Sequence, residues 1–190
     1  VTPDGTVWYI KDQLVATIST ENGIVQTPLL YLGSYYGVET ACEGYVVNSE
    51  PFYFTFTYGD QTVELVEQSL TIENKPQMGQ IKITKVDAET GKPIIQSPAT
   101  FEIYATEDVV TPDGTVRYTK GQLVDTIQTV EGVATSKPLY IGKKAEFAVI
   151  ETVAPEGYVL GSGDTPRMAA LTYDRRFATL KKMSTGAMVD

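Results

Sequence analysis

The feature that most constrains the fold of this 190-residue chain is an internal repeat. The segment VTPDGTVWYIKDQLVATI at residues 1–18 recurs as VTPDGTVRYTKGQLVDTI at residues 110–127. The similarity continues in two further pairs of segments: LLYLG (29–33) with PLYIG (138–142), and ETACEGYVV (39–47) with ETVAPEGYVL (151–160). Self-similarity over this length predicts that the chain is built from two homologous domains.

The two copies differ in extent. In the second copy about 30 residues, GQIKITKVDAETGKPIIQSPATFEIYATEDV (79–109), precede the VTPDGT motif, and the first copy has no counterpart of them. We therefore expect the first repeat to lack its opening strands and to leave a sheet edge that a strand from another molecule could fill. Because Pro and Gly in KPQMG (75–79) interrupt strand pairing, we predict a truncated repeat at residues 1–76 and a complete repeat at residues 77–190.

Short alternating runs predict an all-β fold. An apolar residue recurs at every second position in Phe101 and Ile103, in Phe147 and Val149, and in the run PFYFTF at residues 51–56. The 12 Tyr favour strands, while the 10 Pro and 16 Gly are spread along the chain as turn residues. No segment has the periodicity of a long helix, so each repeat is predicted to be a sandwich of short, half-buried strands.

Composition and charge exclude several classes of function. The net charge of −9 and the scattered Lys and Arg argue against nucleic-acid binding. The absence of His removes Ser-His-Asp catalysis, Cys-His catalysis and the usual zinc sites, and we predict no cofactor and no specific metal. Cys42 is the single cysteine, so a durable secreted protein of this kind needs a crosslink other than an internal disulfide. No apolar run reaches membrane-spanning length, so no membrane insertion is expected from this segment.

Three ionisable residues fall at positions that should face a core. Lys85 lies in phase with Ile81 and Ile83 on a predicted strand, and the same alternation points Glu151 and Asp190 inward. Burying a Lys and two acids separately would cost several kcal/mol each, and a buried ion pair often fails to recover its desolvation. The alternatives are an edge lysine that guards against aggregation, a Glu that accepts turn hydrogen bonds, and a frayed terminal Asp.

The three residues together suggest a self-crosslinking reaction. Burial favours the neutral amine of Lys85, which is a nucleophile, and the neutral forms of the two acids. If the amine attacks the Asp190 carboxyl carbon, Glu151 can polarise the carbonyl oxygen and relay protons while water leaves. The product is an amide bond that closes a loop of about 100 residues, for which crosslink entropy suggests about 4–5 kcal/mol.

The first repeat carries only part of this set. Glu39 occupies the position that matches Glu151, and Asn74 follows Leu70 and Ile72 in phase as the acceptor-equivalent residue. The matching Lys would lie upstream of Val1, so we expect no bond in the first repeat unless another Lys substitutes.

Three motifs resemble one known family. They are ITKVDAETGKP (83–93), ATFEIYA (99–105) and ETVAPEGY (151–158). The chain resembles the CnaB-type, or SpaA-like, isopeptide-forming domains of Gram-positive surface adhesins and pilins, which implies two tandem immunoglobulin-like (CnaB/prealbumin-like) β-sandwich domains. The resemblance also implies Lys85 as the reactive Lys, Glu151 as the catalytic Glu and Asp190 as the acceptor. Asn acceptors are commoner in the family, so an Asn acceptor stays open.

The resemblance implies a role outside the cell. We expect a structural module of a stalk or pilus-like protein. The module would be extracellular and anchored to the cell wall through its parent protein, and its partners would be the neighbouring repeats of that parent. Tandem repeats on short linkers are typical of such rods. The alternative is an adhesin module that binds a host extracellular protein or glycan. We do not expect turnover of added substrates, because Glu151 is the single plausible catalytic group and acts once on its own chain.

Overall fold

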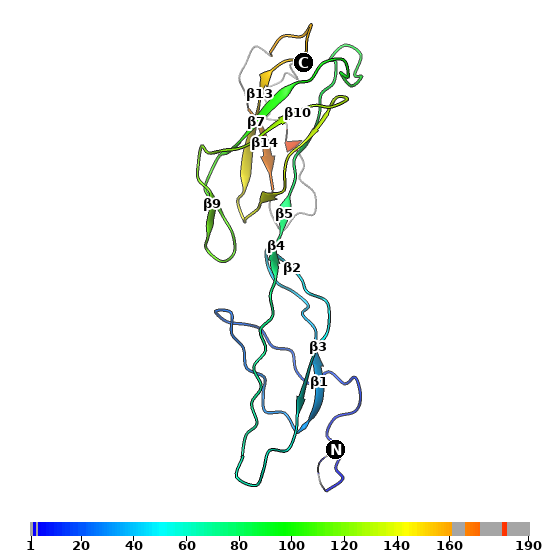
Figure 1. Ribbon diagram of the computed structural model, residues 1–190, viewed down its shortest axis with the longest axis vertical. Coiled ribbons are helices and arrows are strands. Elements are labelled where there is room, and N and C mark those ends of the chain that lie inside the picture. The colour runs from blue at the N-terminus through cyan, green and yellow to red at the C-terminus, as the bar shows by residue number, and fades with distance from the viewer. Residues whose placement is uncertain (1, 3, 161–165, 172–179, 182–190) are drawn as a thin grey trace. The chain divides into compact units, whose positions relative to one another are not determined.

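The computed structural model describes residues 2, 4–160, 166–171 and 180–181. These residues form strands and no helix, which confirms the all-β prediction for the part of the chain that is described. They divide into two compact units (Figure 1). Unit 1 comprises residues 1–41 and 47–73, and unit 2 comprises residues 42–46 and 74–190. The tandem arrangement with a boundary between residues 76 and 77 stays a prediction.

The main sheet of unit 2 has five antiparallel strands in the order β10–β7–β13–β14–β15. Their bounds are Thr100–Ala105 (β7), Leu123–Gln128 (β10), Glu146–Val153 (β13), Arg167–Ala170 (β14) and Leu180–Lys181 (β15). Strand β13 lies between β7 and β14 (Figure 1), and Val149 pairs with Ile103 on one side and Arg167 on the other. Both edges of β13 are therefore hydrogen-bonded within the sheet.

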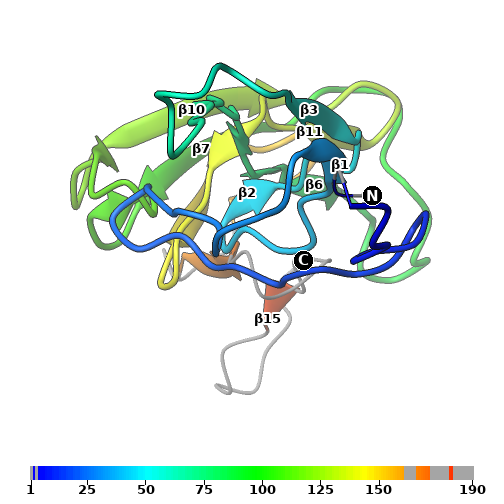
Figure 2. The ribbon, with the colours of Figure 1, turned by 90° about the horizontal axis from the view of Figure 1, so that it is seen from below.

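Four two-stranded ladders complete unit 2. They are β2 (Tyr45–Val46) with β4 (Lys75–Pro76), β5 (Met78–Gly79) with β12 (Leu139–Tyr140), β6 (Lys82–Thr84) with β11 (Val133–Thr135), and β8 (Val109–Val110) with β9 (Val116–Tyr118). Strands β6 and β11 lie side by side in Figure 2 and pair antiparallel, with Ile83 opposite Ala134. This pair supplies the layer that faces the main sheet.

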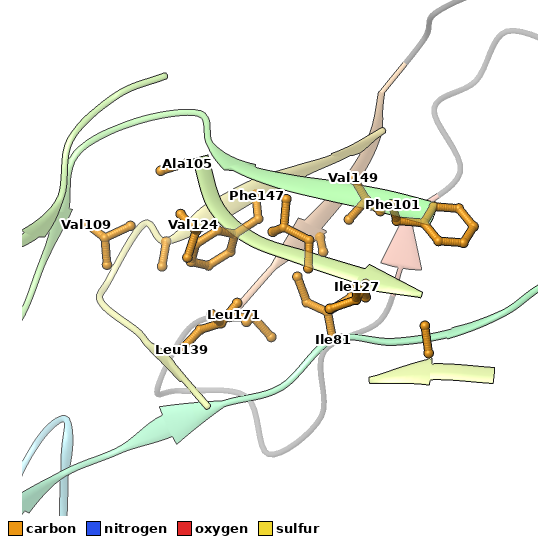
Figure 3. Packing of buried hydrophobic residues seen from close by; sticks show 14 of the residues in the cluster. Ile81, Phe101, Ala105, Val109, Val124, Ile127, Leu139, Phe147, Val149 and Leu171 are labelled. Carbon is orange, nitrogen blue, oxygen red and sulfur yellow. The ribbon is translucent and has the colours of Figure 1, made fainter. Parts of the chain in front are cut away.

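The core of unit 2 lies between these two layers. Strand β7 alternates strictly, so that Phe101, Ile103 and Ala105 are buried while the residues between them are half-buried. Figure 3 shows Ile81, which directly precedes β6, and Leu139 of β12 on the side of the core opposite Phe147 of the main sheet. Apolar alternation on both layers thus produces one contiguous hydrophobic core.

Unit 1 is built differently from unit 2. Its one ladder among the described residues joins β1 (Gly33–Gly37) to β3 (Phe52–Phe56), with Tyr35 opposite Phe54. Both strands alternate between half-buried and exposed residues, as the run at 51–56 predicts. None of the described hydrophobic residues of unit 1 is fully buried; the first buried hydrophobic residue along the chain is Ile81. Unit 1 therefore has partly covered apolar residues in place of a closed core.

The sequence repeat recurs in local structure. In VTPDGT, Asp113 accepts hydrogen bonds from the Thr111 hydroxyl and from the backbone and hydroxyl of Thr115, and Asp4 accepts the equivalent bonds from Thr2 and Thr6. These bonds, the one from Thr111 above all, lower the pKa of Asp113 to about 2. Three further turns recur at matched positions: Ile10 to Gln13 with Thr119 to Gln122, Glu21 to Ile24 with Val130 to Val133, and Cys42 to Tyr45 with Pro155 to Tyr158.

No helix in the described part of the chain is long and apolar enough to cross a membrane.

Candidate functional site around Lys85

Lys85 directly follows strand β6, and its backbone is held on both sides. Its N–H donates to the Gly132 carbonyl at 2.8 Å, and its carbonyl accepts from the Ile94 N–H at 3.0 Å. The side chain is buried, in phase with Ile81, while Lys82 is exposed, as the alternation predicts. The interpretation of Lys85 as a solvent-facing edge lysine is therefore wrong.

Glu151 faces the same space from the main sheet. It lies on β13 opposite Phe101, immediately before a bulge that separates it from the pairing at Val153. Together with Phe147 and Val149 it forms the inward face of that strand, although its side chain keeps partial exposure. A bulge re-aims neighbouring side chains, and this one lies next to the carboxylate.

The two side chains meet in a mostly buried ion pair. Lys85 Nζ donates to Glu151 Oε2 at 2.9 Å, and the two side chains are 10% and 17% exposed. The other ion pairs among the described residues lie at the surface, with side chains at least 28% exposed. Exposed ion pairs contribute little to the free energy of unfolding. In a desolvated pair, removing one partner is strongly destabilising, because the other charge is then buried without a counter-charge.

The two carboxylate oxygens of Glu151 differ in their hydrogen bonding among the described residues. Oε1 is buried and has no hydrogen-bond partner among the described residues. A buried acceptor without a partner costs about 1–3 kcal/mol, so native structures rarely keep one without a reason. The buried amine of Lys85 thus donates to one carboxylate oxygen of Glu151. The other oxygen could accept a hydrogen bond from a third polar group.

The segments that carry Lys85 and Glu151 are also joined by two hydrogen bonds. The Tyr158 hydroxyl donates to Asp87 Oδ2 at 2.9 Å, and the Glu156 N–H donates to Ser97 Oγ at 2.8 Å. The bond from Tyr158 raises the pKa of its own hydroxyl, while the backbone bond from Thr90 does most to lower the pKa of Asp87. The sequence did not reveal the hydrogen bond between Tyr158 and Asp87, since nothing in the local pattern pairs these two residues.

Gly132, whose carbonyl accepts the hydrogen bond from the Lys85 N–H, lies where a side chain would not fit. Its φ is +78°, and a Cβ there would lie 2.9 Å from Pro93 Cβ and 3.1 Å from the Ile94 carbonyl oxygen. Since the Gly132 carbonyl holds the Lys85 N–H, any shift that relieves this overlap moves the lysine. Local sequence did not identify Gly132 as part of the site, because its carbonyl reaches Lys85 only through tertiary pairing.

Replacing Gly132 with Ala should therefore destabilise unit 2 more than the same change at an open position. The left-handed conformation alone costs about 1–2 kcal/mol for a residue with a Cβ, and overpacking adds about 1–3 kcal/mol. The matched control is Gly114→Ala, where φ is +81° and no atom lies within 4 Å of the added Cβ. Urea denaturation checks both variants, and equal losses would show that the space around Gly132 relaxes freely.

Three further residues were predicted as site residues: Asp190, Glu39 and Asn74. Asp190 lies outside the described residues, so its role as acceptor stays a prediction. In the first repeat, Glu39 Oε2 accepts from the Asn48 N–H at 2.7 Å, and Asn74 Nδ2 donates to the Val46 carbonyl at 3.0 Å. Glu39 belongs to unit 1 and Asn74 to unit 2, and their equivalence to a catalytic Glu and an acceptor stays a prediction.

Part of the chain matches a known protein family. Residues 79–166 match the family model described as SpaA, prealbumin-like fold domain. The matched segment contains both Lys85 and Glu151. No curated protein and no solved structure matches the chain.

Proposed function

Since residues 79–166 form a SpaA-like, CnaB-type prealbumin domain, we propose that this chain is a structural module of a bacterial surface stalk or pilus-like fibre, stabilised by an intramolecular Lys85–Asp190 amide bond. The observation that supports the proposal is the ion pair between Lys85 and Glu151. The second carboxylate oxygen of Glu151 is buried and has no hydrogen-bond partner among the described residues. An inward amine next to an acid with spare hydrogen-bonding capacity is the arrangement that amide formation needs.

The reaction follows from ordinary acid–base chemistry. Glu151 takes a proton from the Lys85 ammonium across the 2.9 Å hydrogen bond, which leaves a neutral amine. The amine attacks the carboxyl carbon of the Asp190 carboxylate. Glu151 passes this proton, and then the second proton that the nitrogen loses, to the departing oxygen, which leaves as water. One C–N bond forms, one C–O bond breaks, and one water leaves. Glu151 ends in its starting state, but the lysine is consumed, so the chain reacts once and does not turn over added substrates.

The proposed bond suits a load-bearing role. Lys85 directly follows strand β6, early in unit 2, and Asp190 comes much later in the same unit. An amide between them would close a loop of about 100 residues and cannot be reduced as a disulfide can. Kinetic stability of this kind protects against unfolding under force and against proteolysis. We place the module outside the cell, with neighbouring repeats of its parent protein as its partners.

Intact mass spectrometry of the purified chain tests the proposal. The expected mass is one water below the sequence mass, because amide formation expels water. Lys85→Ala and Glu151→Ala should each restore the full mass, the first by removing the nucleophile and the second by removing the proton relay. A loss of ammonia in place of water would assign an Asn acceptor and make Asp190 wrong.

The matched control for this measurement is Lys82→Ala. Lys82 lies three residues before Lys85 but is exposed, so its removal should leave the loss of one water unchanged. Full mass in the parent chain would refute the crosslink and leave the Lys85–Glu151 contact as an ion pair.

A further inference from the structure

Asp87 organises the short hairpin that begins at Lys85. Its Oδ1 atom accepts hydrogen bonds from the Thr90 N–H at 2.7 Å and from the Thr90 hydroxyl at 2.8 Å. Its own N–H donates to the Lys92 carbonyl at 2.9 Å, and the Ile94 N–H donates to the Lys85 carbonyl at 3.0 Å. An Asp side chain that bonds the backbone a few residues on stabilises a tight turn. Asp87 therefore fixes the backbone that carries the Lys85 amine.

The other carboxylate oxygen of Asp87 bonds a different segment. Oδ2 accepts a hydrogen bond from the Tyr158 hydroxyl at 2.9 Å. Tyr158 ends a turn in the segment that follows β13, where its N–H donates to the carbonyl of Pro155, a residue whose side chain is fully buried. In the same turn, the Glu156 N–H donates to Ser97 Oγ. One carboxylate thus holds the hairpin with one oxygen and the turn after β13 with the other.

The hydrogen bond between Tyr158 and Asp87 joins the two layers that carry the ion pair. Among the described residues, β6 pairs with β11 whereas β13 pairs with β7 and β14, so no backbone ladder joins β6 to β13. The 2.9 Å separation of the Lys85 amine and the Glu151 carboxylate therefore depends on how the two layers are held near these residues. A reacting group misplaced by about 1 Å can react about 100-fold more slowly.

We propose that Asp87 and Tyr158 are positioning residues for amide formation at Lys85. This inference rests on the proposed function, because it concerns the rate of the same reaction. The hydrogen bond between the two residues holds the Lys85 segment against the Glu151 segment while the amine attacks, and neither residue exchanges a proton with the reacting groups. If the pair acted on stability alone, its loss would slow the reaction only in proportion to the unfolded fraction of the chain.

Cell-free synthesis of the full chain tests the proposal. Translation is stopped with an inhibitor after a short pulse, at a temperature at which most of the parent chain has not yet reacted. Samples are then quenched in acid at intervals, and the fraction lighter by one water is measured by intact mass spectrometry. Tyr158→Phe keeps the ring and removes the hydroxyl, and we expect it to form the amide at least about tenfold more slowly than the parent.

The matched control is Tyr104→Phe. The Tyr104 hydroxyl also donates to a carboxylate, that of Glu102, so this variant loses the same kind of hydrogen bond from unit 2. Both residues lie on β7, so their hydrogen bond does not join two segments. Tyr104→Phe should therefore change the rate of amide formation less than about twofold.

Two substitutions of Asp87 separate its hydrogen bonds from its charge. An Asn side chain keeps an oxygen that accepts from Thr90 and supplies an amide N–H that can donate to the Tyr158 hydroxyl. We expect Asp87→Asn to react within about threefold of the parent rate, because the hydrogen bonds are replaced rather than lost. Asp87→Ala loses both hydrogen bonds and should react at least as slowly as Tyr158→Phe.

Urea denaturation of the same variants in a Lys85→Arg background separates positioning from stability. Arg keeps a positive charge beside Glu151 but forms no amide, so the folded fraction of each chain can be measured without the crosslink. We expect Tyr158→Phe to stay more than about 90% folded under the conditions of the rate assay, since one exposed hydrogen bond contributes little to stability. A tenfold slower reaction in a folded chain is then an effect on positioning.

Three outcomes would overturn the proposal: Tyr158→Phe reacts at the parent rate, Tyr104→Phe slows the reaction as much as Tyr158→Phe does, or the loss of folded chain accounts for the slower reaction. A parent chain that keeps its full mass at all times would refute the crosslink itself, and this proposal with it. The two failures are distinguishable, because the first three outcomes leave the parent lighter by one water.

Discussion

Replacing Glu151 with Ala is expected to lower the free energy of unfolding of unit 2 by about 3–5 kcal/mol through the ion pair alone. The variant leaves Lys85 Nζ in a mostly buried setting without the carboxylate that accepts its hydrogen bond at 2.9 Å. If Glu151 also catalyses amide formation, the variant loses the crosslink, which adds about 4–5 kcal/mol for a loop of about 100 residues.

A double variant separates these two contributions. Lys85→Met with Glu151→Leu removes both charges and keeps apolar volume, a replacement that is often neutral or stabilising for a buried pair. If the proposed amide forms, the double variant still remains about 4–5 kcal/mol less stable than the parent. If the contact is an ion pair and nothing more, the double variant should be about as stable as the parent.

Denaturation must be followed separately in each unit for this comparison. Trp8 is the single tryptophan and belongs to unit 1, so its fluorescence reports on that unit. Hydrogen exchange at the amides of β7 and β13 reports on unit 2. If the amides of β7 and β13 exchange at the same rates in the double variant as in the parent, the crosslink is contradicted. This holds whatever the stability of Glu151→Ala.

The second large effect is expected at Phe147, whose side chain is completely buried in unit 2. Phe147→Ala should lower the free energy of unfolding by about 3–5 kcal/mol, because it removes apolar contact and leaves a cavity. The matched variant is Tyr35→Ala, the equivalent position of unit 1, where the ring is half-buried and makes the same edge-to-face contact. We expect a loss of about 1–2 kcal/mol there, since less area is removed from water on folding.

Urea denaturation of both variants, read by the same unit-specific probes, checks this contrast. Equal losses would contradict the prediction that the half-buried ring of Tyr35 contributes less than the fully buried ring of Phe147.

Much of unit 2 was predictable because strand alternation and turn formation depend on residues close together in the sequence. Alternation places Ile81 and Lys85 on one face, and each is buried in the structure. The repeated VTPDGT turns depend on an Asp and a Gly at set positions, and both copies form the same hydrogen bonds. The prediction that Lys85 and Glu151 share an inward space rested on the same alternation, and the ion pair agrees with it.

Other features depended on residues far apart in the chain. The contact of Gly132 with Lys85 and the bond from Tyr158 to Asp87 join segments whose pairing no local pattern specifies. The bulge beside Glu151 arises from a shift in the pairing register between β13 and β7. The periodicity of a single strand does not reveal such a shift.

Local sequence specifies the all-β character, the repeat, and the inward direction of Lys85 and Glu151, because side-chain alternation and turn chemistry operate over a few residues. Which of the inward residues are truly buried depends on the tertiary fold. Ile127 and Ile18 follow the same local pattern, yet one is buried and the other exposed. Burial requires a second layer to exclude water, and whether that layer is present is a property of the assembled fold rather than of any single strand.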